Sequence, residues 1–349
     1  MTTVHVPEGR LRAYAQFLAA IFYFFLARAL AHRGAIGLAP EQFTPLVEQA
    51  MLLFLLLVGF TGMGFAINRQ QHPMSEQGLA RRPGFRREIG MGLTIGWAAA
   101  LICTIAMALG GGIVIRLSLD LRSWGWLVAD ALYFAFLAMA EEVAFRGYVF
   151  QRFTRAVGST GAVLGFGLLY AFLMAVQIGT TRRVSLAFWF LFSVLLSTAY
   201  LRTRALWVSW GLNFGWKASR ALLFGLAVNG DTSHTPIVQG DPTGPFWLTG
   251  AGFGLEGSWF AFLVLMAAIP VLYSATRDLD FRYNVPELIP GGIAVDLDAA
   301  ARRQHEQAMG AAPAQPTLVQ IAPLSNPQNG QQNLPEIPQA PPNTGNESL

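Results

Sequence analysis

The composition of this 349-residue chain is typical of a membrane protein. Hydrophobic residues make up 53% of the chain and charged residues only 13%, whereas soluble domains contain about 25% charged residues. A single cysteine, Cys103, excludes an intrachain disulfide and a cysteine metal cluster. The formal net charge of +4 comes from arginines spread over several short loops rather than a stripe, which argues against nucleic-acid binding.

Eight apolar stretches are long enough to cross about 30 Å of hydrocarbon as helices. Backbone groups in lipid must be satisfied within each segment, so the sequence predicts an all-α, polytopic bundle of about eight transmembrane helices. No cleaved signal peptide is expected, because the first apolar run is too long and no clear small-residue cleavage site follows it. In chain order, the predicted spans are residues 13–31, 45–67, 89–115, 124–144, 160–178, 185–201, 205–226 and 257–274.

The arginine bias predicts the orientation of the bundle. The loop 68–88 contains five arginines and is therefore placed in the cytoplasm. Eight spans then put both termini in the cytoplasm and put the loop 227–256, which contains no lysine or arginine, outside. Arg182 and Arg183 are the exception, because they fall on the external side. Arginine replaces lysine almost everywhere, which indicates a GC-rich bacterial genome and hence a bacterial plasma membrane.

The composition changes at about Arg277. Residues 310–349 are rich in Pro, Gln, Asn and Ala and contain no aromatic residue. Such a segment cannot bury enough apolar area to offset its ordering entropy. The sequence therefore predicts a transmembrane bundle over residues 1–276 and a largely disordered cytoplasmic tail over residues 277–349.

Two adjacent carboxylates, Glu141 and Glu142, end an apolar run, and Arg146 follows one helical turn after Glu142. Residues 124–140 contain only one charge, Asp130. Carboxylates in such a segment are costly to desolvate, so they are usually partnered and often functional. All five histidines of the chain lie outside the predicted spans.

Three pairs of residues with i, i+4 spacing share helix faces in successive spans. Chemistry that needs two groups on one ion or substrate often uses this spacing. The pairs are Glu142 with Arg146, Tyr170 with Met174, and Asn213 with Lys217.

The order of these pairs resembles the CPBP family, which comprises type II CAAX prenyl endopeptidases and bacteriocin-processing proteins. That family is marked by Glu-Glu-x-x-x-Arg, then aromatic-x-x-x-His, then His-x-x-x-Asn. The first motif is intact here and is followed by a family-like Gly147-Tyr148-Val149-Phe150, and residues 200–216 resemble the third-motif region. The resemblance covers about residues 124–226. It implies a helical intramembrane peptidase, with catalytic Glu141 and Glu142, Arg146 orienting them, and zinc in an active member.

The chain departs from the family pattern at the remaining motif positions. Met174 and Asn213 stand where the family has histidines, and Lys217 stands where it has asparagine. Thioether and amide groups are poor zinc ligands, and an ammonium cannot bind a cation, so no metal is expected. Lys217 is the only lysine of the chain. A lone ammonium near the bilayer interior costs about 2.5–3.5 kcal/mol, so we expect Lys217 to pair with Glu141 or Glu142 around a cavity that includes Tyr170.

Four functions follow from these observations. The favoured one is a degenerate, metal-free peptidase that binds a membrane peptide, lipid or protein partner. The first alternative is an active endopeptidase in which Glu141 activates water and Asn213 supplies an oxyanion donor. The second is a transporter with Glu141, Glu142 and Lys217 along its path. The third is a structural anchor. Simpler interpretations also stand: a surface ion pair for Glu142, core packing for Tyr170 and Met174, an interhelical hydrogen bond for Asn213, and snorkelling for Lys217.

Overall fold

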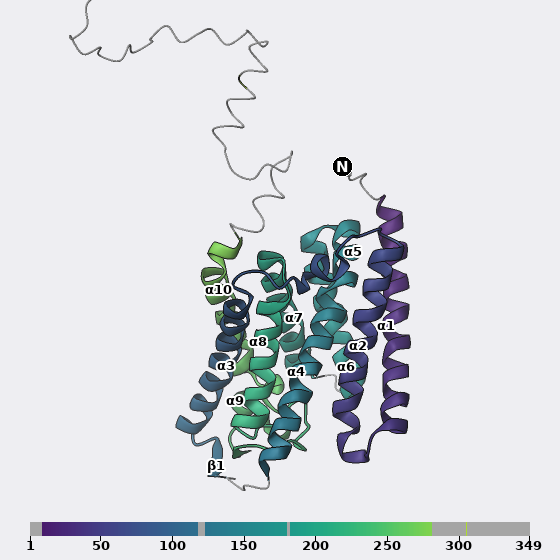
Figure 1. Ribbon diagram of the computed structural model, residues 1–349. Helices are drawn as coiled ribbons and strands as arrows, with labels where there is room; N and C mark the ends of the chain where they lie inside the picture. The colour runs from purple at the N-terminus through teal and green to yellow at the C-terminus, as the bar shows by residue number, and fades with distance from the viewer. Residues whose placement is uncertain (1–8, 118–122, 180–181, 281–304, 306–349) are drawn as a thin grey trace, which may run out of the picture. The chain divides into compact units, whose positions relative to one another are not determined.

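The computed structural model describes residues 9–117, 123–179, 182–280 and 305, and most of them lie in helices that run up and down one bundle (Figure 1). The predicted helical membrane bundle is confirmed. Its longer helices are α1 (Arg10–Leu38), α2 (Thr44–Ala66), α3 (Phe85–Leu109), α4 (Trp124–Arg146), α6 (Ser159–Ile178), α7 (Arg183–Thr203), α8 (Trp207–Ala218) and α10 (Trp259–Ala275). Short helical segments lie between them, namely η1 (Glu41–Phe43), η2 (Ser75–Leu79), α5 (Tyr148–Val157), η4 (Ser219–Leu223), α9 (Phe246–Thr249), η5 (Ala251–Phe253) and η6 (Leu255–Gly257).

Within the described ranges, five helical segments are long and apolar enough to cross a membrane: α1, α2 with η1, α3, α6 and α7. Helix α10 is apolar but shorter, and the predicted number of eight spans stays a prediction. Large hydrophobic side chains such as Phe22, Phe54 and Phe172 are exposed along α1, α2 and α6. Exposed apolar faces of this kind are expected where helices contact lipid.

The predicted third span, 89–115, extends too far. Helix α3 ends at Leu109, and the chain turns through three glycines, of which Gly111 has a left-handed φ of 62°. Strand β1 (Ile113–Leu117) then pairs antiparallel with strand β2 (Val238–Pro242), with Ile115 opposite Gly240. An apolar run cannot by itself distinguish a helix end from a short strand, which is why this two-stranded sheet was not predicted.

The predicted seventh span, 205–226, is also too long. Helix α8 ends at Ala218, a π-helical turn covers Ser219–Leu223, and Gly225 reverses the chain with φ 60°. A Cβ at Gly225 would lie 2.5 Å from the carbonyl oxygen of Val238, so only glycine lets β2 approach this closely. Residues 219–226 therefore leave the helix and cover its end.

Helices α3 and α8 pack with their backbones nearly in contact. A Cβ placed on Gly92 or Gly96 would meet carbonyl oxygens of α8 at 2.1 and 2.3 Å, and one on Gly211 or Gly215 would meet those of α3 at 2.4 and 2.6 Å. Each helix thus presents two glycines four residues apart, a spacing that permits close packing of membrane helices. This contact sets the position of α8, which carries Asn213 and Lys217.

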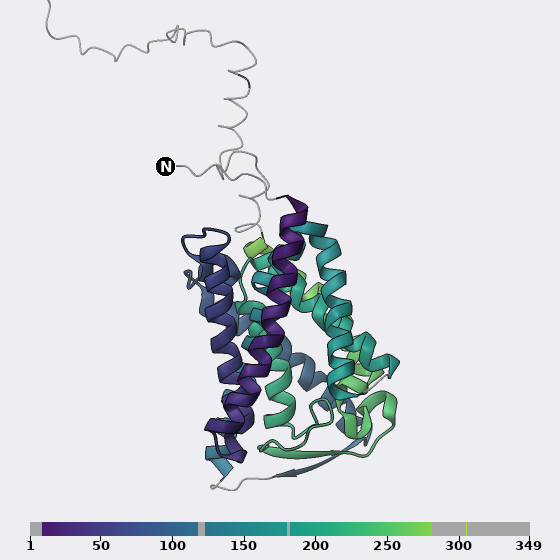
Figure 2. The same ribbon diagram turned by 90° about the vertical axis from the view of Figure 1, so that its right-hand side faces the viewer.

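Several arginines, among them Arg12, Arg82 and Arg202, lie at the end of the bundle where α1 begins and α10 ends. Arg82, in the loop 68–88, donates hydrogen bonds to Glu88 and to the carbonyl oxygen of Thr203, at 2.8 and 2.6 Å. Figure 2 shows the β1–β2 sheet and its neighbouring loops at the opposite end. The cytoplasmic placement of both termini stays a prediction. The predicted tail lies outside the described residues from position 281 onwards, His305 excepted.

Candidate functional site

The carboxylates of Glu141 and Glu142 lie on different sides of the last turns of α4, because adjacent helix residues point about 100° apart. The side chain of Glu142 is fully buried, whereas that of Glu141 is 11% exposed. Helix α4 packs against α8 at this level, so both carboxylates lie next to the polar residues of α8. Each glutamate consequently has its own set of partners.

The side-chain amide of Asn213 joins the two glutamates. Its Nδ2 donates to Glu141 Oε2 at 2.8 Å and to Glu142 Oε1 at 3.0 Å. Asn213 is fully buried, so these two hydrogen bonds to charged groups are made away from water. The simpler interpretation of an interhelical hydrogen bond therefore describes Asn213 correctly, but its acceptors are the two carboxylates.

The Lys217 ammonium lies against Glu141. Its Nζ is 2.5 Å from both carboxylate oxygens, and its side chain is 5% exposed. Lys217 lies one turn after Asn213 on the same face of α8, which is why both reach the same carboxylate. The sequence left open which glutamate Lys217 would meet, and the structure places it at Glu141.

Arg146 is the cation beside Glu142. Its Nη1 is 3.6 Å from Glu142 Oε1, and its Nη2 donates to Ser193 Oγ on α7 at 2.9 Å. The guanidinium also lies over the rings of Tyr170 and Phe145, 5.6 and 5.8 Å from their centroids. The sequence analysis missed Ser193, because the only indication of a role was a hydroxyl group within an apolar span.

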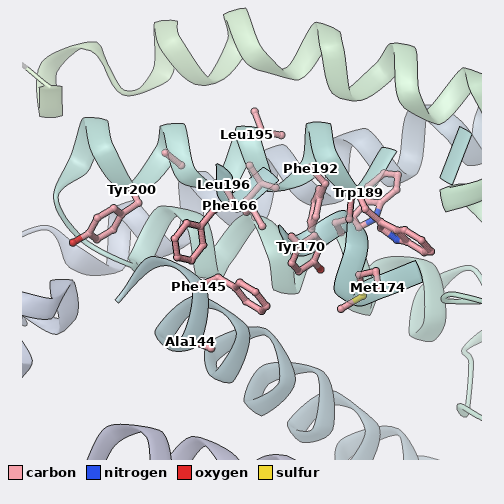
Figure 3. Close-up of a cluster of buried hydrophobic side chains, with 14 of the residues drawn as sticks. Ala144, Phe145, Phe166, Tyr170, Met174, Trp189, Phe192, Leu195, Leu196 and Tyr200 are labelled. Atoms are coloured by element: carbon pink, nitrogen blue, oxygen red, sulfur yellow. The ribbon is translucent and has the colours of Figure 1, made fainter. Parts of the chain in front are cut away.

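Tyr170 and Met174 lie on one face of α6, in the aromatic core between α4, α6 and α7 (Figure 3). The Tyr170 ring packs edge-on against Phe145, with centroids 5.2 Å apart. Among the described residues, Met174 makes no hydrogen bond or ion pair with the glutamates, and it belongs to the hydrophobic core. The structure thus brings Tyr170 to Arg146 and leaves Met174 as a packing residue.

Several buried polar atoms of this site have no hydrogen-bond partner within the described part of the chain. They are Glu142 Oε2, Asn213 Oδ1, and Nε and Nη1 of Arg146. An unsatisfied buried donor or acceptor costs about 1–3 kcal/mol, so such groups are unusual without a ligand or water. The site therefore offers both free acceptors and free donors around Glu142.

A comparison with protein-family models matches residues 123–219 to the family described as Type II CAAX prenyl endopeptidase Rce1-like. Over this range the chain is similar to that family, which supports the resemblance to the CPBP family. No curated protein and no solved structure matches the chain significantly. The matched range runs from the residue before α4 to the residue after α8, so it contains all three i, i+4 pairs. It agrees with the region 124–226 that the sequence motifs indicated.

The residues present do not fit the zinc site that the resemblance to the CPBP family implies for an active enzyme. No group of three or more His, Cys, Asp or Glu side chains within the described ranges could hold a metal ion. Both oxygens of Glu141 already face the Lys217 ammonium. A bound cation would have to displace that ammonium, so the site carries its positive charge on side chains.

A further buried ion pair lies beside the site and was not predicted. Arg220 in η4 is fully buried, and its Nη2 is 2.5 Å from Glu256 Oε1 in η6. Arg220 also donates through Nε to the carbonyl oxygen of Trp216 and lies 4.6 Å from the Trp216 ring centroid. Glu256 lies outside the family match. The sequence signal was weak, because Arg220 follows the polar residues of α8 and Glu256 lies in a loop.

Proposed function

We propose that this protein is a CPBP-family membrane protein whose peptidase site has become a metal-free site that binds a membrane partner without cutting it. The observation that carries the proposal is the contact of Lys217 Nζ with both oxygens of Glu141. A general base must be free to accept a proton within hydrogen-bond reach. In this site an ammonium and an amide already occupy the Glu141 carboxylate.

The charge balance of the site supports a stable, non-catalytic arrangement. Glu141 has Lys217, Glu142 has Arg146, and Asn213 donates to both carboxylates. Burying an isolated charge is very unfavourable, whereas a paired and hydrogen-bonded charge is tolerated. The charges of the four groups therefore balance, although some of their atoms lack a hydrogen-bond partner, and a metal is not needed to neutralise the glutamates.

The unpartnered polar atoms favour a peptide among the predicted partners. Glu142 Oε2 and Asn213 Oδ1 are acceptors, and Arg146 Nε and Nη1 are donors, all buried without hydrogen bonds. A peptide backbone supplies both a donor and an acceptor at each residue, whereas an acyl chain supplies neither. We infer that a membrane-embedded peptide segment, free or part of a protein, is the partner that best matches this site.

Binding and cleavage can be separated in one experiment. The full-length protein, reconstituted in lipid, is incubated with a prenylated CAAX-type peptide that carries a photo-crosslinking group. We expect crosslinks to residues near Glu142 and no cleavage product, and we expect Glu142→Leu to abolish the crosslinks. The matched control is Glu76→Leu, at an exposed glutamate in η2. Crosslinking that Glu142→Leu leaves unchanged would disprove binding at this site.

A second candidate function, an active endopeptidase, is favoured by one observation. Glu142 Oε2 is buried and has no hydrogen-bond partner, so Glu142 could bind a water that Glu141 cannot. Cleavage of the same peptide that is lost in Glu142→Gln but kept in Glu141→Gln would establish this function. Stoichiometric zinc in the purified protein, lost with either substitution, would instead establish an ordinary metallopeptidase.

A further inference from the structure

Arg182 and Arg183 lie at the start of α7, and both are exposed. The other end of α7 is fixed by the hydrogen bond from Arg82 to Thr203, so the two arginines lie at the opposite end of the bundle from the arginine-rich loop 68–88. The orientation rule does not explain arginines on this side of the bundle. Their surroundings indicate why arginine is found here.

An open pocket of about 470 Å³ lies at these arginines. It is lined by Arg182, Arg183, Val184, Phe246 and Trp259, so two guanidinium groups lie beside two aromatic side chains. The Arg182 guanidinium lies over the rings of Phe246 and Phe253, 5.1 and 5.8 Å from their centroids. Stacking on two rings holds this cation in place, so less side-chain freedom is lost when an anion binds.

The pocket lies at the level where two apolar helices begin. Helix α7, which is long enough to cross a membrane, starts at Arg183, and α10 starts at Trp259. The first residue of a spanning helix lies at the boundary between hydrocarbon and headgroups. Tryptophan and arginine are both favoured at that boundary, the first for its amphipathic ring and the second for its long stem.

We propose that this pocket binds the phosphate group of an anionic phospholipid in the leaflet at this end of the bundle. The planar fork of arginine donates two parallel hydrogen bonds to a phosphate, and the positive charge of two adjacent arginines attracts it. Trp259 and Phe246, which are 49% and 39% exposed, provide an apolar surface for the glycerol and the first acyl carbons. The proposal is independent of the site around Glu141 and Glu142.

The test uses full-length protein in nanodiscs that contain a phosphatidylglycerol with a photoactivatable group near its headgroup. Crosslinked peptides are mapped by mass spectrometry for the wild type and for Arg182→Gln/Arg183→Gln. We expect labels on residues 182–184 or 246–259, and an apparent affinity about 30-fold lower in the variant, which corresponds to about 1 kcal/mol for each arginine. If the double variant fails to fold, Arg183→Gln alone provides the same test, because it leaves the stacking of Arg182 intact.

The matched control is Arg86→Gln/Arg87→Gln, at two adjacent exposed arginines at the start of α3, with Arg86 also over a phenylalanine ring. This control should leave the labelling at residues 182–184 and 246–259 unchanged. Equal labelling by a phosphatidylcholine analogue, or labelling unaffected by both arginine variants, would overturn the proposal. Displacement of the label by millimolar inorganic phosphate would show that the pocket binds phosphate, but that its ligand is a soluble phosphate and not a phospholipid.

Discussion

Lys217 and Glu141 meet in the core of the protein although 76 positions separate them in the chain. The contact exists because glycines let α8 pack tightly against α3 while its other face lies along α4. It also leaves Arg146 as the cation for Glu142, so each glutamate has its own positive charge. Four charged groups and one amide thus form a polar centre within a largely apolar bundle.

Removal of the Lys217 ammonium should destabilise the fold. Lys217→Met leaves the carboxylate of Glu141 buried without its cation, so we expect the free energy of unfolding to fall by about 3–5 kcal/mol. Unfolding in mixed detergent micelles measures this change. Combining Lys217→Met with Glu141→Gln should recover most of the loss, and strictly additive effects would show that the two side chains do not interact. Arg116→Met, at an exposed arginine of β1, is the control.

The glycine contact between α3 and α8 should be sensitive to a single methyl group. Gly96→Ala would place Cβ 2.3 Å from the carbonyl oxygen of Leu212, so the helices must separate, at a cost of about 1–3 kcal/mol. Gly90→Ala, on the same helix but with open space around its Cβ, should be neutral or stabilising by up to about 1 kcal/mol. Thermal unfolding of the two variants side by side tests this, and equal effects would contradict the close approach.

The buried pair of Arg220 and Glu256 should behave differently from a surface pair. Glu256→Leu leaves a fully buried guanidinium without its partner, with an expected loss of about 3–5 kcal/mol in unfolding free energy. The double variant Arg220→Met/Glu256→Leu should return close to wild-type stability. Asp280→Asn, which breaks the more exposed pair with Arg202, should cost less than about 1 kcal/mol. If Glu256→Leu and Asp280→Asn lowered the unfolding free energy by similar amounts, burial would not be the cause of the loss.

Restoring the family pattern should create a metal site that the natural chain lacks. The triple variant Met174→His/Asn213→His/Lys217→Asn removes the ammonium, adds an imidazole at position 213 beside Glu141 and Glu142, and adds a second imidazole on α6. We expect about one zinc per chain by elemental analysis of the purified variant, and none in the wild type. Zinc in the wild type, bound without these histidines, would refute the metal-free proposal.

Helix positions were predicted best where one apolar run corresponds to one helix. The predicted spans 160–178 and 185–201 correspond to α6 and α7 within two residues, because length and hydrophobicity suffice there. The prediction failed where the apolar run continues past the helix. After Gly110 the chain stays apolar but forms a strand whose partner lies more than a hundred residues away. After Ala218 it forms a π-helical turn, in which Leu222 accepts a hydrogen bond from Ile237, 15 residues away. Composition alone carries no information on such pairings.

The sequence alone determined that this is a helical membrane protein and which of its helices carry charge. It also determined that Glu142 shares a helix face with Arg146, and Asn213 with Lys217. These properties depend on neighbours within one or two turns, so local spacing specifies them. Only the tertiary structure decided that Lys217 pairs with Glu141, that Asn213 joins both glutamates, and that Arg220 is paired with Glu256. The partner of a buried charge depends on which helices approach each other and how closely, and here glycine contacts between α3 and α8 set that approach.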